Sequence, residues 1–178
     1  MTLIPDDELR LELTAPHHAP ALLQLVNDNR EHLQRFLPWV PLMQAEADFL
    51  KYIEKCRQLY EQGSEISFVI YYKNEAAGRI GIHYINPANK SGAIGYWLAE
   101  QAGGKGIITR SCRTVINHGF SQLQLNRIEI KAAVENTKSQ AIPERLGFTI
   151  EGILRQAEWV HDRFLDLKLY SLLKEEWK

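Results

Sequence analysis

The most informative stretch of the chain is Tyr96-Trp97-Leu98-Ala99-Glu100-Gln101-Ala102-Gly103-Gly104-Lys105-Gly106-Ile107-Ile108-Thr109, in which three glycines separate a predicted strand from a predicted helix. Glycine lets the backbone approach a ligand closely, because it has no side chain in the way. The unpaired N–H groups and the positive dipole at a helix N-terminus attract anions. We therefore favour a pyrophosphate site over a plain strand-to-helix turn.

Two familiar phosphate-binding motifs do not fit this bend. A Walker loop needs Ser or Thr after Gly-Lys, but Gly106 follows Lys105. A dinucleotide fingerprint that begins at Gly104 would need a small residue where Thr109 stands. The strands before the bend also form a predicted meander instead of opening a βαβ unit, which excludes a Rossmann site on context as well.

Hydrophobic periodicity predicts the elements around the bend. Residues 67–72, 78–85 and 93–98 form strands joined by short turns, which predicts an antiparallel meander. After the bend the period changes from two to 3.6. The apolar residues then share one helical face, which comprises Ile108, Cys112, Val115, Ile116 and Phe120. The two cysteines, Cys56 and Cys112, lie in helical patterns without metal-ligand spacing, so we expect buried thiols.

The two ends of the chain continue the mixture of helices and strands. A strand over 9–13 precedes one helix marked by Leu22, Leu23 and Val26 and a second marked by Phe49, Ile53, Cys56 and Tyr60, which Gly63 ends. After the central helix come a strand at 128–132, a short helix at 139–146 with Pro143 near its first turn, and strands at 148–154 and 165–169. We find no repeat and no linker, so we expect a single α+β domain over 1–178.

Composition narrows the class of protein. The 178 residues carry a formal net charge of -1, which gives no basic footprint for nucleic acid. No apolar run is long enough for a membrane span, and Asp6, Asp7 and Glu8 near the N-terminus differ from a secretory signal, so we expect a cytoplasmic protein. The six histidines show no spacing typical of metal ligands, which makes His83 and His118 ordinary, partly buried residues and predicts no metal.

The bend resembles the acetyl-CoA loop of the GCN5-related N-acetyltransferase (GNAT) superfamily, and specifically of its ribosomal-protein N-terminal (RimJ/RimL-type) branch. Residues 33–41 are similar to that branch's segment between the first two helices. Asn136-Thr137-Lys138-Ser139 and Leu146-Gly147-Phe148 resemble its Asn-x-x-Ser and Leu-Gly-Phe pair, and residues 151–155 and 166–170 follow in the expected order. The resemblance extends over nearly the whole chain.

This resemblance implies a GNAT-like mixed, largely antiparallel central sheet that is splayed in the middle after residues 93–98 and flanked by helices. The pantetheine of acetyl-CoA would pair with the free backbone of that strand, and a backbone N–H near Leu98 would stabilise the reacting carbonyl oxygen. Gly103 supplies no side chain, so the pyrophosphate is expected to bind the backbone N–H groups from Gly104 to Thr109. The implied cofactor-binding set is Tyr96, Trp97, Leu98, Gly103, Gly104, Lys105, Gly106, Ile107, Ile108, Thr109, Asn136 and Ser139.

Catalysis requires a neutral amine and a stabilised leaving thiol. Glu158 matches the branch's base, and burial beside Trp159 and apolar strands would raise its pKa; Asp166 is the rival carboxylate. Ser139 would donate a hydrogen bond to the sulfur while Asn136 holds the pantetheine amide, unless both residues merely cap the following helix. Tyr170 is a second candidate donor to the sulfur.

Phe36 and Trp39 would line the acceptor site, although core packing is an equal alternative. The resemblance predicts acetyl transfer to a primary amine, foremost the N-terminal α-amine of a ribosomal protein. A polyamine, an amino acid or an antibiotic amine is the alternative acceptor. A protein that binds acetyl-CoA without catalysis is an alternative of another class. Family analogy also suggests a homodimer.

Overall fold

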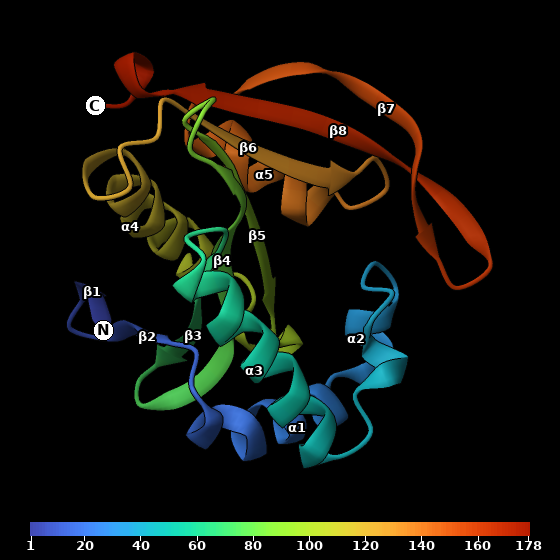
Figure 1. Ribbon diagram of the computed structural model, residues 1–178. Helices are drawn as coiled ribbons and strands as arrows, with labels where there is room; N and C mark the ends of the chain where they lie inside the picture. The colour runs from blue at the N-terminus through green and yellow to red at the C-terminus, as the bar shows by residue number, and fades with distance from the viewer.

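The computed structural model describes residues 1–178 and contains one eight-stranded sheet in the order β1-β2-β3-β4-β5-β6-β8-β7 (Figure 1). Neighbouring strands are antiparallel except for β5 and β6, which are parallel. This arrangement confirms the expected mixed, largely antiparallel α+β sheet. The strands are β1 (Thr2–Asp6), β2 (Leu9–Leu13), β3 (Ile66–Tyr72), β4 (Glu75–Asn86), β5 (Ser91–Leu98), β6 (Arg127–Ala133), β7 (Thr149–Val160) and β8 (Arg163–Leu173).

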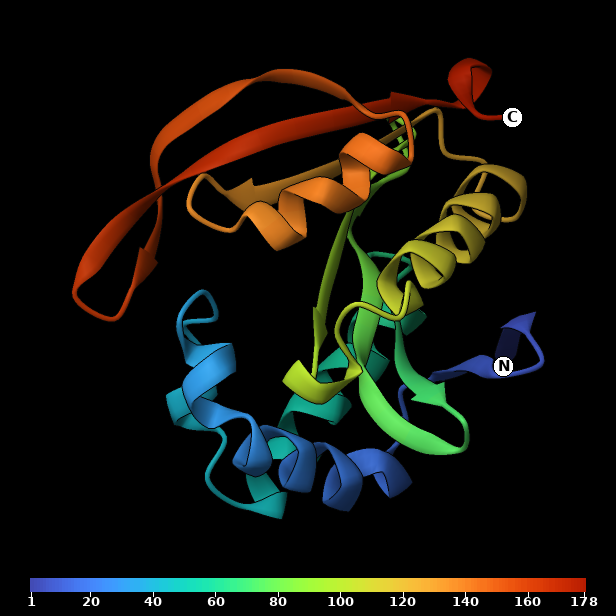
Figure 2. The same cartoon turned by 180° about the vertical axis from the view of Figure 1, so that it is seen from behind.

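The sheet is splayed between β5 and β6. Their parallel register ends at Ile94↔Ile130, although β5 continues to Leu98 and β6 continues to Ala133. The two strands leave their common end in different directions, as both views show (Figures 1 and 2). Beyond Ile94, β5 still pairs with β4 on one side but has no strand partner on the other. The predicted opening in the middle of the sheet is therefore confirmed.

Helices cover both faces of the β1–β5 half. The helices α1 (Ala19–Asp28), α2 (Arg30–Gln34) and α3 (Glu46–Glu61) precede β3, whereas α4 (Ile107–Ser121) follows β5 and α5 (Thr137–Arg145) follows β6. Phe68 joins the core beneath α4, and the next residue, Val69, joins the core beneath α1 and α3. Because side chains alternate along a strand, these two cores lie on opposite faces of the sheet. Figure 2 shows α5 along β6, on the other side of the opening.

Most predicted elements are confirmed, and the buried stripe of α4 lies in the core as expected. The sequence did not predict β1 or the short helix α2. Tyr60 was placed on the buried face of its helix but is 42% exposed. The position of Pro143 was also wrong. The helix α5 begins at Thr137, so Pro143 lies inside it, well after the first turn, where a missing N–H is costly.

A buried asparagine ties the first helices to the segment after β5. Asn29, between α1 and α2, donates from Nδ2 to the Leu25 carbonyl at 2.8 Å and accepts the Glu100 N–H at 2.9 Å. Glu100 begins the 3-10 helix η3 (Glu100–Ala102), which leads into the glycine bend. Asn29 thus fixes the start of the bend relative to α1. None of the helices combines the length and the apolar character that a membrane span requires.

We expect Asn29→Ala to lower the free energy of unfolding by about 1–3 kcal/mol, because it leaves a buried carbonyl and an amide without their partner. Asp28→Ala is the control, since that carboxylate is exposed and only accepts a bond from Gln24. The control should change stability by less than about 0.5 kcal/mol. Urea unfolding followed by tryptophan fluorescence measures both. Equal unfolding midpoints for the two variants would show that the hydrogen bonds of the Asn29 side chain contribute nothing to stability.

Candidate active site

The glycine bend has the geometry that an anion site needs. Gly104 (φ +77) and Gly106 (φ +70) adopt left-handed backbone conformations, which other residues adopt only with strain. A Cβ at either position would meet no atom within 4 Å. Glycine is therefore required there for its backbone torsion angles and not for lack of space. Gly106 is the N-cap residue of α4 and provides no capping side chain.

The backbone N–H groups from Gly104 to Thr109 have no acceptor within the chain. The first bond of α4 runs from the Arg110 N–H to the Gly106 carbonyl, and none precedes it in the helix. Ile107 and Ile108 are buried, so their side chains fix the first turn of the helix in the core. Unpaired amides together with the positive end of a helix dipole are features that bind phosphate groups in proteins.

Basic side chains lie beside these amides. Lys105 lies 5.7 Å from the centre of the Tyr72 ring and has no acidic partner. Arg145, at the end of α5, reaches across the opening and donates to Thr109 Oγ1 at 3.1 Å, also without an acidic partner. Arg145 was not predicted, because no sequence pattern indicated that the end of α5 meets the start of α4.

Two predicted residues from opposite sides of the opening are in contact. The Tyr96 hydroxyl, on β5, donates to the Ser139 carbonyl, on α5, at 2.8 Å. The Ser139 hydroxyl oxygen lies 3.3 Å from the Tyr96 oxygen. Burial raises the pKa of Tyr96 well above its ordinary value, so the phenol stays protonated at neutral pH. Ser139 is thereby held beside the unpaired edge of β5.

Asn136 shows the local role that the sequence had left open. Its Oδ1 accepts the Ser139 N–H at 3.1 Å and so caps α5. The amide nitrogen of Asn136 has no partner in the chain, so its contact with pantetheine stays a prediction. Tyr170 is 1% exposed and donates its proton to Glu144 at 2.9 Å. Burial, assisted by Glu144, raises the pKa of Tyr170 to about 12. Its proton is therefore already engaged.

Glu158 lies half-buried on β7, opposite Leu165 of β8. Burial raises the pKa of its carboxyl above the ordinary value, as expected. The expected cause was partly wrong, because Trp159 is 52% exposed and packs edge-to-face on Phe164. Successive side chains point to opposite faces of a strand, so Glu158 shares the face of Leu165 and Val160, whose apolar cluster also includes Phe36.

The rival carboxylate, Asp166, has a structural role. It is exposed, and its Oδ1 accepts the Gln156 N–H at 2.7 Å. This bond falls where the β7 register shifts between Leu154 and Glu158. Asp166 thus satisfies an amide that the irregular strand leaves unpaired.

A cleft of about 580 Å³ opens between the end of α2 and the β7–β8 turn. Phe36 and Val160 line it together with polar and charged residues. Trp39 is not part of the lining but packs on Trp97, with ring centres 5.8 Å apart. His161, in the turn, contacts the Gln34 carbonyl through Nε2 at 2.7 Å and so joins the two walls of the cleft.

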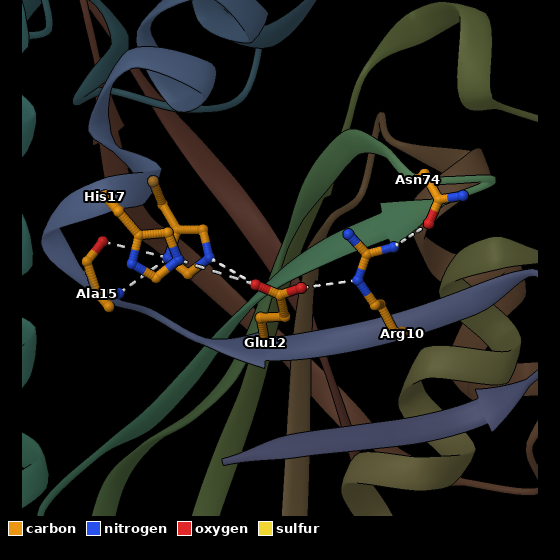
Figure 3. Close-up of polar contacts among 6 residues, drawn as sticks. Arg10, Glu12, Ala15, His17 and Asn74 are labelled. Carbon is orange, nitrogen blue, oxygen red and sulfur yellow. Dashed lines mark hydrogen bonds and ion pairs between the residues drawn. The ribbon is translucent and has the colours of Figure 1, made fainter.

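One group of potential metal ligands was not apparent from the spacing of histidines. The ligand atoms of Glu12, His17 and His18 lie within 4.8 Å of one another (Figure 3). The Nδ1 atom of His18 accepts the Ala15 N–H at 3.0 Å, so Nε2 carries the proton and donates to Glu12 at 3.1 Å. Glu12 also binds Arg10 at 2.7 Å. These bonds satisfy the fully buried His18 as a structural residue.

Comparison with known proteins places this geometry in a family. Residues 8–149 match the family described as the Acetyltransferase (GNAT) domain. The chain is 36% identical to the putative ribosomal N-acetyltransferase YdaF of Bacillus subtilis, over 97% of this chain and 95% of that protein. It is 35% identical to the ribosomal-protein-serine acetyltransferase of Escherichia coli, over 96% and 95% of the two chains.

Solved structures agree with the sequence comparison. The ribosomal L7/L12 α-N-protein acetyltransferase RimL, in complex with coenzyme A, superimposes with a TM-score of 0.95, at 31% identity and with 99% of each chain covered. The resemblance noted in the sequence therefore extends to the whole fold. The splayed sheet, the unpaired amides at the start of α4 and these matches together show that the chain belongs to the GNAT acetyltransferase family.

Proposed function

We propose that this protein transfers an acetyl group from acetyl-CoA to a primary amine, foremost the N-terminal α-amine of a ribosomal protein, by direct attack in a ternary complex. One observation carries the proposal: the unpaired edge of β5 leads directly to the unpaired amides from Gly104 to Thr109. A single extended carrier with amide groups and a diphosphate can satisfy both sets of groups. Acetyl-CoA is such a carrier, and RimL was solved with coenzyme A.

The diphosphate would accept hydrogen bonds from the amides of the bend, with Lys105 and Arg145 adding positive charge. The pantetheine would add as a strand to β5 beyond Ile94. The free amide nitrogen of Asn136 would donate to one of its carbonyl oxygens. In this arrangement the thioester lies between β5 and α5, close to Ser139.

The reaction begins with the loss of a proton from the amine. An α-amine with a pKa near 8 requires about 1 kcal/mol for this at pH 7, whereas a lysine requires about 4–5 kcal/mol. A half-buried carboxylate such as Glu158 is a sufficient base for an α-amine. The neutral nitrogen then attacks the thioester carbon, and a backbone N–H near Leu98 stabilises the oxyanion. The C–S bond breaks with its electron pair on sulfur, and Ser139 donates a hydrogen bond to the departing thiolate. The extra proton on the nitrogen passes to this thiolate, which leaves a neutral amide and the coenzyme-A thiol.

The acceptor would enter through the cleft that Val160 lines, two residues along β7 from Glu158. Phe36 and Val160 offer it an apolar wall, and residues of the hairpin turn, among them Asp162 and Arg163, line the cleft as well. An N-terminal peptide suits this open, polar cleft, and the E. coli relative acts on a ribosomal-protein serine. A polyamine is the second candidate, because the spermidine N(1)-acetyltransferase of E. coli is 28% identical over 62% of this chain. The half-buried carboxyl of Glu158 and Ser139, held beside the unpaired edge of β5, favour a catalyst over a protein that only binds acetyl-CoA.

We further propose that residues 1–178 act as one acetyltransferase domain and that two copies pair. The edge strand β7 carries Ile150 and Ile153, each 53% exposed, and such an edge favours association. The expected absence of nucleic-acid binding and the cytoplasmic location stay predictions.

We expect Glu158→Gln to lower kcat/KM for an N-terminal peptide by about 100-fold at pH 7, because the amine loses its proton acceptor. Asp166→Asn is the matched control: it also removes one carboxylate charge, but it keeps the oxygen that accepts the Gln156 N–H. That variant should stay within about two-fold of wild type, since a neutral oxygen still accepts this bond. A coenzyme-A release assay measures both. The opposite ranking would make Asp166 the base.

The same carboxylate should cost stability at neutral pH. Folding raises the pKa of Glu158, so the folded state binds its proton more tightly than the unfolded state does. Wild type then loses stability as the pH rises from the pKa of Glu158 in the unfolded state to its higher pKa in the folded state. Glu158→Gln has no such loss. The variant should therefore unfold at a higher temperature than wild type at pH 7 and at the same temperature near pH 4. A variant that is less stable at both pH values would contradict the burial argument.

We expect Gly106→Ala to weaken coenzyme-A binding by about ten-fold or more, because a strained N-cap moves the amides of the bend. Gly63→Ala is the matched control: Gly63 also has φ +70 and open space around it, but it ends α3. Both variants should lose similar stability, about 1–2 kcal/mol, whereas only Gly106→Ala should bind the coenzyme weakly in calorimetry. Equal affinities of the two variants for coenzyme A would show that the bend is not part of the binding site.

The acceptor is identified by comparing a ribosomal-protein N-terminal peptide, spermidine and amino-acid amines under one assay. We expect the peptide to give the highest kcat/KM, and its rate to rise with pH up to about 8, where the α-amine loses its proton. The same peptide with a blocked α-amine and a free lysine should react poorly at pH 7. A preference for spermidine would establish the second candidate instead.

A further inference from the structure

A proline inside α5 leaves one carbonyl of the helix without its usual donor. In an α-helix the N–H of each residue bonds to the carbonyl four residues earlier. Pro143 has no N–H, and its ring also crowds the carbonyl at that position, which is the carbonyl of Ser139. Proline is the least favourable residue for a helix interior, so its presence here needs a reason beyond the helix itself.

The Ser139 carbonyl accepts the Tyr96 hydroxyl instead, at 2.8 Å. A phenol has one proton, and this bond uses it. The Tyr96 oxygen can then only accept from the Ser139 hydroxyl, which lies 3.3 Å away. Tyr96 thus binds the backbone and the side chain of the same serine, and it does so across the opening between β5 and α5.

We propose that Pro143 is a positioning residue: it reserves the Ser139 carbonyl for Tyr96, and the phenol then holds the Ser139 hydroxyl oxygen beside the thioester position. The catalytic consequence rests on the proposed function. As the C–S bond breaks, the Ser139 hydrogen rotates from the phenol to the thiolate sulfur, while the oxygen keeps its place. No other residue has to move, because the bond from Tyr96 to the carbonyl remains.

The test begins with Pro143→Ala. The new N–H bonds to the Ser139 carbonyl and competes with the phenol for this oxygen, so we expect the bond from Tyr96 to weaken. Removing a proline from a helix interior favours folding, so this variant should melt at the same temperature as wild type or above it. It should nevertheless show about ten-fold lower kcat with KM for acetyl-CoA within about two-fold, as expected for one lost hydrogen bond acting on the departing thiol.

Pro20→Ala is the matched control. Pro20 lies in the first turn of α1, where a missing N–H leaves no carbonyl without a donor. It should change neither kcat nor the environment of Tyr96. Tyr96→Phe should lower kcat as Pro143→Ala does, and the double variant should be no slower than Tyr96→Phe alone, because both changes break the same link.

A readout without substrate separates this inference from the proposed function. The ¹³Cζ resonance of Tyr96, assigned by its loss in Tyr96→Phe, reports the hydrogen bond of the phenol. It should shift in Pro143→Ala but not in Pro20→Ala. An unchanged resonance in Pro143→Ala would overturn the inference even in an active enzyme, and so would additive losses of kcat in the double variant. Failure of wild type to acetylate any amine would instead overturn the proposed function, and the resonance would still decide whether Pro143 controls Tyr96.

Discussion

Main-chain N–H and C=O groups require partners, and this chain leaves two neighbouring sets of them open. Beyond Ile94, one edge of β5 has no strand partner, and the amides from Gly104 to Thr109 have no acceptor. Only η3 separates the two sets, and Asn29 fixes η3 to α1. The unsatisfied groups therefore form a continuous line on a rigid support, which a carrier with matching polar groups can complete.

The two halves of the sheet meet along a short parallel seam, so other contacts must set the width of the opening. Tyr96 reaches Ser139 near the middle, and Arg145 reaches Thr109 beside the glycine bend. His161 contacts the Gln34 carbonyl in the cleft between α2 and the β7–β8 turn. Each of these contacts joins one half to the other through a polar group. These polar contacts fix the shape of the opening together with the apolar core that both halves share.

Much of the fold was predictable because its signals are local. The period of 3.6 in α4, the alternation in the central strands and the glycines of the bend each depend on residues close in sequence. The short strand β1 was missed because its apolar and acidic residues show little alternation, and α2 is too short to show a helical period.

The candidate site was predictable only in part. Resemblance to a family indicated Glu158, Ser139 and the bend. The contact between Ser139 and Tyr96 was not predictable, because the two residues are far apart in the sequence. The raised pKa of Glu158 followed from its apolar strand, but the aromatic neighbour in sequence points to the other face. Pro143 was misplaced because the helix starts at the residue after its asparagine cap, a boundary that periodicity does not define. Contacts between distant segments, such as that of Arg145, have no local signal.

The short paired region between β5 and β6 also separates residues with different proposed roles. The backbone groups that would grip the carrier belong to residues up to Thr109, whereas Ser139 and Glu158 come after the seam. Substitutions around Glu158 on β7 can therefore alter which amine is accepted, and how fast it reacts, while the backbone amides that would bind the carrier stay unchanged. A fold divided in this way can come to accept different amines during evolution while it keeps the same backbone groups for the acetyl donor.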